Sequence, residues 1–205
     1  MSSYFNSLAR DWDNNPITIE RTKAISEELH KIIPVKNNQT ALEFGAGTGS
    51  LSVALKDLFS EITLMDSSSE MVAVTNEKLF NLNIHHLLPI YFDLEKEEYS
   101  AKTFDLVFTQ MSLHHVTDIE KMISKFYQLI NSGGSIAIAD LYKEDGSFHE
   151  GEFNGHFGFE PEELSKIMEK VGFKEISYKK CFEIIKPEGP NAGKPFPVFL
   201  MVAKK

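Results

Sequence analysis

The amino-acid sequence predicts an α/β fold with a mostly parallel sheet, and three observations carry this prediction. Strand-like and helix-like segments alternate between about residues 40 and 140. A glycine-rich turn follows the first of the strand-like segments. Acidic residues close two other apolar runs, at Asp66 and Asp140. This alternation is typical of parallel strands that are joined by crossover helices.

The composition indicates one globular domain. A chain of 205 residues with 42% hydrophobic and 25% charged residues can bury one sizeable core. The formal net charge of −9 disfavours nucleic acid as a partner, because phosphate binding favours basic surfaces. The single cysteine, Cys181, excludes an internal disulfide and is consistent with a reducing compartment. Without a transmembrane-length apolar run or an apolar signal core, we expect a cytoplasmic protein with no membrane span.

The first two thirds of the chain supply most of the expected elements. Pro16 stands in the first turn of a helix that Pro34 ends. Pro89 predicts an edge position for the third strand, because proline cannot donate to a central ladder. Capping boxes that begin at Ser67 and Thr117 predict the starts of two helices. Strands are expected at residues 40–44, 62–66, 87–92, 104–109 and 136–139.

The pattern changes after Asp140. Residues 141–160 are rich in Gly, Phe, His and acids without a clean period, and a loop of this length is usually functional or mobile. Pro161 begins one more helix and Gly172 ends it. Two strand-like segments, 175–184 and 198–203, then predict an antiparallel hairpin. The sheet is therefore expected to be mixed.

The turn after the first strand, residues 45–49, is the most informative motif. Its glycines let the backbone turn sharply and approach a ligand closely. A dinucleotide-binding G-x-G-x-x-G pattern would need a glycine where Ser50 stands. Glu43, just before the turn, would also be an awkward neighbour for a pyrophosphate. A cationic, ribose-bearing cofactor, such as a sulfonium with an ammonium group, suits this carboxylate better.

These motifs resemble those of the class I S-adenosylmethionine-dependent methyltransferases. Glu43-x-Gly45-x-Gly47-x-Gly49 resembles the first motif of that family, and Asp66 matches its ribose-binding acid. Residues 104–108 and the following Gln-Met-Ser-Leu-His-His-Val segment, 110–116, resemble the fourth-strand motif of its small-molecule subgroup. That subgroup includes the ubiquinone/menaquinone-biosynthesis and type 11 methyltransferases. The resemblance spans roughly residues 35–205.

The resemblance implies a fold and a division of the chain. The implied fold is a doubly wound three-layer sandwich with a seven-stranded sheet of order 3-2-1-4-5-7-6 and an antiparallel last strand. Residues 1–205 would form a single methyltransferase domain, as a monomer or homodimer. Its parts would be an N-terminal lid and helix (1–34), a cofactor-binding core (35–140), a substrate loop (141–160), and a helix with a C-terminal hairpin (161–205).

The resemblance also implies an activity and a set of site residues. The activity is transfer of the methyl group of S-adenosylmethionine to an O, N or C nucleophile of a small-molecule acceptor by in-line displacement, with S-adenosylhomocysteine as product. The glycine turn would line the methionine end, and Asp93 would lie near the adenine. The cofactor-binding residues implied are Glu43, Gly45, Ala46, Gly47, Asp66, Ser67, Met71, Asp93, Leu94, Gln110 and Met111.

His114 and His115 are the candidate catalytic residues. A neutral imidazole can accept a proton from a nucleophile near physiological pH. The alternative is that one of the pair packs in the loop or caps the next helix. We expect no metal, because no Cys or His stands at a supporting sequence spacing nearby. His149, Phe153 and the neighbouring aromatic residues either pack an irregular loop or wall an aromatic substrate pocket.

Two other functional classes stay open. An NAD-dependent oxidoreductase would use the same fold, but Ser50 disfavours it. A non-catalytic cofactor-binding or partner protein is compatible with the sequence, because an already activated methyl group requires no particular catalytic residue. A DNA amino-methyltransferase is disfavoured, since the Asn/Asp-Pro-Pro-Tyr motif is absent after the fourth strand.

Overall fold

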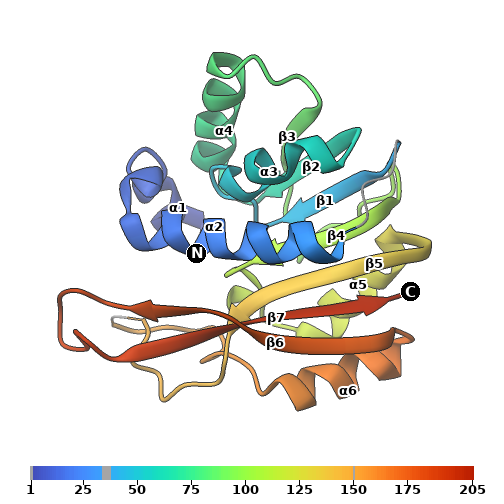
Figure 1. Ribbon diagram of the computed structural model, residues 1–205. Helices are drawn as coiled ribbons and strands as arrows, with labels where there is room; N and C mark the ends of the chain where they lie inside the picture. Colours follow the sequence, from blue (N-terminus) through green and yellow to red (C-terminus); the bar gives the residue numbers. More distant parts are fainter. Residues whose placement is uncertain (1, 34–37, 150) are drawn as a thin grey trace.

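The computed structural model describes residues 2–33, 38–149 and 151–205, and one seven-stranded sheet forms its centre (Figure 1). The strand order is β3-β2-β1-β4-β5-β7-β6. Strands β1 to β5 pair in parallel, whereas β7 runs antiparallel to both β5 and β6. The predicted fold and strand order are confirmed. The strands are β1 (Thr40–Phe44), β2 (Glu61–Asp66), β3 (Leu87–Tyr91), β4 (Phe104–Gln110), β5 (Ile130–Leu141), β6 (Lys174–Ile185) and β7 (Pro195–Lys204).

Helices cover both faces of the sheet and make three layers (Figure 1). One apolar cluster joins the sheet to α2, α3 and α4, and the other joins it to α5 and α6. In β1, Ala41 belongs to the first cluster and Leu42 to the second, so the strand is apolar on both sides. The helices are α1 (Ser2–Leu8), α2 (Pro16–Ile32), α3 (Ser50–Leu55), α4 (Ser69–Asn81), α5 (Ile119–Leu129) and α6 (Pro161–Val171), with 3-10 turns η1 (Trp12–Asn14), η2 (Lys56–Leu58) and η3 (Leu113–His115).

The proline and glycine signals mark element ends as predicted. Pro16 is the first residue of α2, and the Asn15 side chain accepts hydrogen bonds from the first turn. Pro161 begins α6, and Gly172 follows its last residue with a φ of 122°. Pro89 lies in β3, which is an edge strand. Helix α2 ends at Ile32, and Pro34, which was expected to end it, lies outside the described residues.

Three local predictions were wrong. Ser68, not Ser67, caps α4 by accepting a hydrogen bond from the Met71 N–H, and Asp118, not Thr117, caps α5. Both capping residues have the extended backbone that this position requires, and in each pair two neighbouring residues are good cap formers, so pattern alone chose the wrong one. Strand β5 also begins at Ile130, well before residue 136, because residues 131–134 bulge out of the ladder while Ile130 still pairs with Phe104.

No helix among the described residues is both long enough and apolar enough to cross a membrane. The features that position a site are the carboxyl ends of the parallel strands. Strands β1 and β4 are neighbours, and the sheet order reverses direction between them. Ligands of open α/β sheets bind at such a crevice, outside the carboxyl ends of the strands.

Candidate active site

The glycine turn leaves β1 at the crevice and bends with a left-handed backbone. Gly45 and Gly47 have φ angles of 64° and 55°, a region that favours glycine. A Cβ on Gly45 would lie 2.5 Å from the Cβ of Ser112, so the turn also packs tightly against the end of β4. A Cβ on Gly47 would have only ordinary contacts, with Met71 and Trp12. Ala46, between the two glycines, is buried.

Asp66 joins the end of β2 to the glycine turn. Its Oδ2 accepts a hydrogen bond of 2.7 Å from the Gly47 N–H, and its Oδ1 accepts one of 2.8 Å from the Ser68 N–H. Burial raises the pKa of this carboxyl, and the backbone N–H groups oppose that rise. Each oxygen retains a second lone pair for a hydroxyl donor. The Asp66 side chain is therefore held between the glycine turn and the start of α4.

Glu43 lies beneath the turn as a fully buried carboxyl group. Its Oε2 accepts hydrogen bonds from the backbone N–H and the hydroxyl of Ser52, while its Oε1 has no partner among the described residues. Burial raises the pKa of Glu43 to about 8. An unpartnered buried acceptor of this kind fits a ligand that brings a positive charge or N–H donors.

The end of β4 contributes the opposite wall. Gln110 accepts a hydrogen bond of 3.3 Å from the Thr22 hydroxyl, and Met111 has a φ of 51°, which is uncommon for a residue with a side chain. The Ser112 hydroxyl donates to the Gly45 carbonyl at 3.0 Å. Ser112 belongs to the 110–116 motif, but no separate role was predicted for it. Its hydrogen bond joins the segment after β4 to the glycine turn after β1.

The remaining predicted cofactor residues lie either at the start of α4 or just after β3. Met71 is buried and Ser67 is exposed, at the start of α4 beside Asp66. Asp93 accepts hydrogen bonds from the Glu95 N–H and from Lys96, and the Leu94 side chain is packed in the core below. The Leu94 side chain is therefore not exposed to a ligand in the crevice, and its carbonyl accepts a hydrogen bond of 2.6 Å from Lys125.

The N-terminal segment lies across the glycine turn. Asn6 accepts a hydrogen bond from the Ser68 hydroxyl at 2.6 Å. Asp13 accepts hydrogen bonds from the hydroxyls of Thr48 and Ser50 and forms an ion pair with Lys78 at 2.6 Å. Figure 1 shows α1 beside the N-terminal end of α2, on the side of the sheet that carries α3 and α4. This segment, which was expected to form a lid, is thus attached to the crevice at two points, through Asn6 and Asp13, and neither contact was predicted from the sequence.

His114 and His115 follow β4 directly and meet residues from distant segments. His114 is buried, and its Nδ1 lies 2.6 Å from Oδ1 of Asp140, at the end of β5. Asp140 also accepts from the backbone N–H groups of His114 and Leu141. The rings of His114 and His115 approach to 4.1 Å between centroids, and His149 of the 141–160 loop joins them.

Sequence spacing did not indicate that His149 lies beside His114 and His115, nor that Asp140 orients the His114 ring. Burial lowers the pKa of His115 to about 2, and burial also lowers the pKa of His149 to about 4, with further lowering by neighbouring histidines. Both rings are therefore neutral at physiological pH. The ring of His149 also stacks on Phe153 at a centroid distance of 3.6 Å, so the loop packs as an aromatic layer against the histidines.

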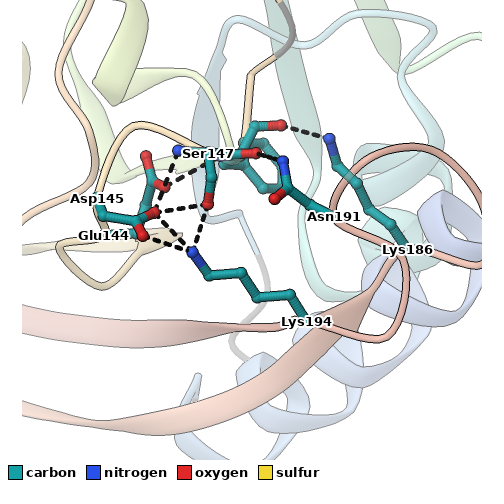
Figure 2. Close-up of polar contacts among 7 residues, drawn as sticks. Glu144, Asp145, Ser147, Lys186, Asn191 and Lys194 are labelled. Carbon is teal, nitrogen blue, oxygen red and sulfur yellow. Dashed lines mark hydrogen bonds and ion pairs between the residues drawn. The ribbon is translucent and has the colours of Figure 1, made fainter.

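The hairpin turn between β6 and β7 holds the loop in this position (Figure 2). Lys194 contacts both carboxylate oxygens of Asp145 at 2.6 and 2.7 Å, and also the Ser147 hydroxyl. Asn191 donates to the Ser147 carbonyl at 2.9 Å, and Lys186 donates to the Phe148 carbonyl, next to His149. Because β7 runs antiparallel, this turn lies at the same edge of the sheet as the carboxyl end of β5.

A cavity of about 440 Å³ lies elsewhere, among residues at the amino ends of the central strands such as Gln39, Asp105 and Ser135. It is far from the glycine turn, because parallel strands separate their amino and carboxyl ends by their full length. We therefore assign the candidate site to the crevice at the carboxyl ends, on the basis of its buried polar groups.

Comparison with known proteins agrees with this fold. A family model described as a methyltransferase domain matches residues 18–178. The chain belongs to this methyltransferase family. A methyltransferase of Bacillus cytotoxicus, itself uncharacterized, is 31% identical over 153 residues, which cover 68% of this chain and 68% of that protein.

Two further relatives differ in how much of them the chain covers. An uncharacterized methyltransferase of Schizosaccharomyces pombe is 31% identical over 139 residues, 64% of this chain and 46% of that protein. The chain thus spans about half the length of that relative. The demethylmenaquinone methyltransferase of Oceanobacillus iheyensis is 23% identical over 179 residues, covering 85% of this chain and 75% of that enzyme.

Solved structures share the fold at low sequence identity. A methyltransferase of Haloferax volcanii, solved in a complex with the activator Trm112, superposes with a TM-score of 0.80 at 17% identity over 98% of this chain and 96% of that chain. An S-adenosylmethionine-dependent methyltransferase of Aquifex aeolicus gives a TM-score of 0.69 at 19% identity, over 100% of this chain and 98% of that one.

Proposed function

We propose that this protein transfers the methyl group of S-adenosylmethionine to a small-molecule acceptor. The observation that carries the proposal is the bond from the Gly47 N–H to Asp66, with the unpartnered Glu43 Oε1 beneath it. Asp66, at the end of β2, and Glu43, in β1, thus bring a carboxylate that can accept hydroxyl hydrogen bonds and a buried acceptor to the same glycine turn. A phosphoethanolamine N-methyltransferase of Haemonchus contortus, solved with S-adenosylmethionine, shares the fold at a TM-score of 0.70 and 18% identity, over 88% of this chain and 52% of that chain.

Each part of the crevice would have a separate task in holding the cofactor. Asp66 would accept hydrogen bonds from the ribose hydroxyls, and Gly45, Ala46 and Gly47 would line the methionine end. Glu43 would face its positive charge from below. Ser67, Met71, Asp93 and the backbone of Leu94 would border the adenosine, and Gln110 and Met111 would stand near the reacting methyl group. The N-terminal segment would act as a lid that excludes water.

When bound, S-adenosylmethionine supplies a methyl group that its sulfonium has already activated. The chain then needs to hold the acceptor in line with it, and proximity alone can contribute about 7–11 kcal/mol in favourable cases. His114 and His115 are proposed to border the acceptor. Of the two, His114 suits proton transfer better, because Asp140 orients its ring and leaves Nε2 available, whereas the low pKa of His115 makes it a weak base.

The acceptor is expected to be small and to present an apolar or aromatic face. The Phe153 ring stacks on His149 at a centroid distance of 3.6 Å and lies 5.3 Å from the His115 ring, and the Phe148 ring lies 5.0 Å from that of His149. These aromatic rings would form the pocket wall on the side of the 141–160 loop. Aromatic side chains bind flat apolar ligands through large contact areas. This wall supports an aromatic substrate pocket over simple loop packing.

Isothermal titration calorimetry with S-adenosylmethionine, S-adenosylhomocysteine and NADH tests the cofactor. We expect the first two to bind and NADH not to. Asp66→Asn should weaken binding by about 10- to 100-fold, because it removes hydrogen bonds to a charged group worth roughly 1.5–3 kcal/mol. Asp57→Asn, at an exposed position on η2, is the matched control and should bind normally.

Two outcomes would change the assignment. Preferential binding of NADH would favour the oxidoreductase. Tight binding of S-adenosylmethionine without release of S-adenosylhomocysteine, across a panel of small quinols, phenols and amines, would favour the non-catalytic cofactor-binding protein.

A further inference from the structure

Three histidine rings converge beside the crevice, and the proposed methyl transfer does not require all of them. His114 and His115 come from η3, and His149 comes from the loop that follows β5. One ring nitrogen of each residue lies within 4.8 Å of one ring nitrogen of each of the others. Hydrogen bonds between the three imidazoles do not account for this close approach, so another interaction must explain it.

One nitrogen of each of the three rings is buried and unpartnered. Nε2 of His114, Nδ1 of His115 and Nε2 of His149 have no hydrogen-bond partner within the described part of the chain. The side chain of His114 is only 1% exposed. Leaving a buried polar atom unpaired costs free energy, and native proteins rarely do so without a function. One ligand bound between the rings would satisfy all three nitrogens at once.

Asp140 prepares His114 for such a ligand. Its fully buried carboxylate takes the Nδ1–H of His114 at 2.6 Å, which leaves the lone pair of Nε2 directed away from Asp140. Histidines that bind metals usually donate their second ring N–H to a carboxylate in this way, which fixes the tautomer and raises the basicity of the ligating nitrogen. The same carboxylate is anchored by the backbone N–H groups of His114 and Leu141.

We propose that His114, His115 and His149 bind one divalent transition-metal ion of the zinc type, with Asp140 as the positioning residue behind His114. Neutral imidazoles favour zinc, copper, nickel and iron over magnesium and calcium, which prefer oxygen ligands. Tetrahedral zinc with bonds of about 2.0–2.1 Å holds its nitrogens about 3.4 Å apart, so the rings close inward slightly on binding. His149 lies on a loop and can supply this movement.

Three protein ligands leave a fourth position open, as in catalytic rather than structural zinc sites. The site adjoins the cofactor crevice, since the His115 ring packs on Phe5 of the N-terminal segment at 5.2 Å, and Ser112 bonds to Gly45. An acceptor oxygen could therefore bind the ion at its open position, where the ion would favour the deprotonated nucleophile. With Nε2 of His114 bound to the ion, the ion would replace His114 as the group that promotes loss of this proton. This role for the ion rests on the proposed methyl transfer, whereas the ion binding itself does not.

Metal titration of tag-free, chelator-treated protein tests the site without any cofactor. We expect one Co²⁺ per chain, with visible absorption typical of a tetrahedral complex, and its displacement by one equivalent of Zn²⁺. His149→Ala and His115→Asn should each weaken Co²⁺ binding by at least tenfold. His85→Ala is the matched control, because His85 is exposed and contacts Asn83, away from the cluster; it should bind normally.

The variant Asp140→Asn tests the role of Asp140 in orienting His114, because Asp140 itself is not a proposed metal ligand. It should weaken Co²⁺ binding by about 10- to 100-fold and alter its spectrum, since the second shell contributes that much to metal affinity. Thermal unfolding of each metal-free variant shows whether it is folded. Absence of a Co²⁺ spectrum in the folded wild type, or undiminished binding in both folded histidine variants, would overturn the proposal. Because no S-adenosylmethionine is present, failure of the methyltransferase assignment would not affect this result.

Discussion

The two halves of the crevice are built in different ways. The glycine half, residues 43–68, gathers its polar groups from one short stretch of chain, with backbone N–H groups holding Asp66. The histidine half joins residues 113–115, Asp140 and His149, which come from three separate segments. The first half needs only one consecutive β-α-β stretch to form, in which α3 supplies Ser52 as the partner of Glu43. The second half needs the sheet, the loop and the C-terminal hairpin to be in place. A substitution that disrupts the structure of one half should therefore leave the other half intact.

The largest expected effect concerns the pH dependence of the glycine half. The pKa of Glu43 is about 8 in the folded protein and 4.5 as a free side chain. Its raised pKa means that the contribution of Glu43 to the free energy of unfolding is fully present below pH 4.5 and is lost as pH rises toward 8. Relative to Glu43→Gln, the wild type should therefore lose roughly 3–5 kcal/mol between these limits.

Urea unfolding of the ligand-free protein and of Glu43→Gln, at several pH values from 5 to about 9, measures this difference. Glu61→Gln, a substitution at a half-buried position at the start of β2, controls for loss of one carboxylate. A constant difference between wild type and Glu43→Gln across the range would show that Glu43 ionises normally and that burial does not raise its pKa.

A second, smaller effect concerns the junction of the two halves. Gly45→Ala and Gly133→Ala both place a side chain at a left-handed φ, but only the former brings its Cβ to 2.5 Å from the Ser112 Cβ. We expect a loss of about 1–2 kcal/mol for Gly133→Ala from the backbone alone. Gly45→Ala should lose about 2–4 kcal/mol, since overpacking adds to that strain.

Chemical denaturation measures both free energies, and the double variant Gly45→Ala/Ser112→Gly tests the cause. It should recover part of the loss, because the substitution of Ser112, just after β4, removes the contacting atoms. Equal losses in Gly45→Ala and Gly133→Ala would mean that the turn and the end of β4 are not tightly packed against each other.

The smallest expected effect concerns the histidine half. Lys194→Met removes the contacts with Asp145 and Ser147 that hold the 141–160 loop, while leaving the core intact (Figure 2). Amide hydrogen exchange of residues 144–149 should become faster, and that of residues 43–68 should not change. Lys180→Met, which removes an exposed ion pair on β6, is the matched control. Faster exchange in both regions would show that the two halves are coupled.

Much of the fold was readable from the sequence because it depends on local signals. Periodic apolar residues, Pro16, Pro161 and Gly172 marked the elements, and Pro89 marked the edge strand. The errors arose where neighbouring residues compete for one role, as with Ser67 and Ser68. The bulge at residues 131–134 was also missed, because it depends on how β5 pairs with β4 and not on residue type.

The candidate site divides in the same way. The sequence by itself placed Glu43, the glycines and Asp66 around one turn, because the ends of neighbouring parallel strands necessarily meet at one edge of the sheet. Only the tertiary structure brought Asp140 and His149 to His114 and His115. Their approach depends on long-range pairing of β5 with β7 and on the contacts of the hairpin turn with the loop, and neither leaves a periodic trace in the sequence.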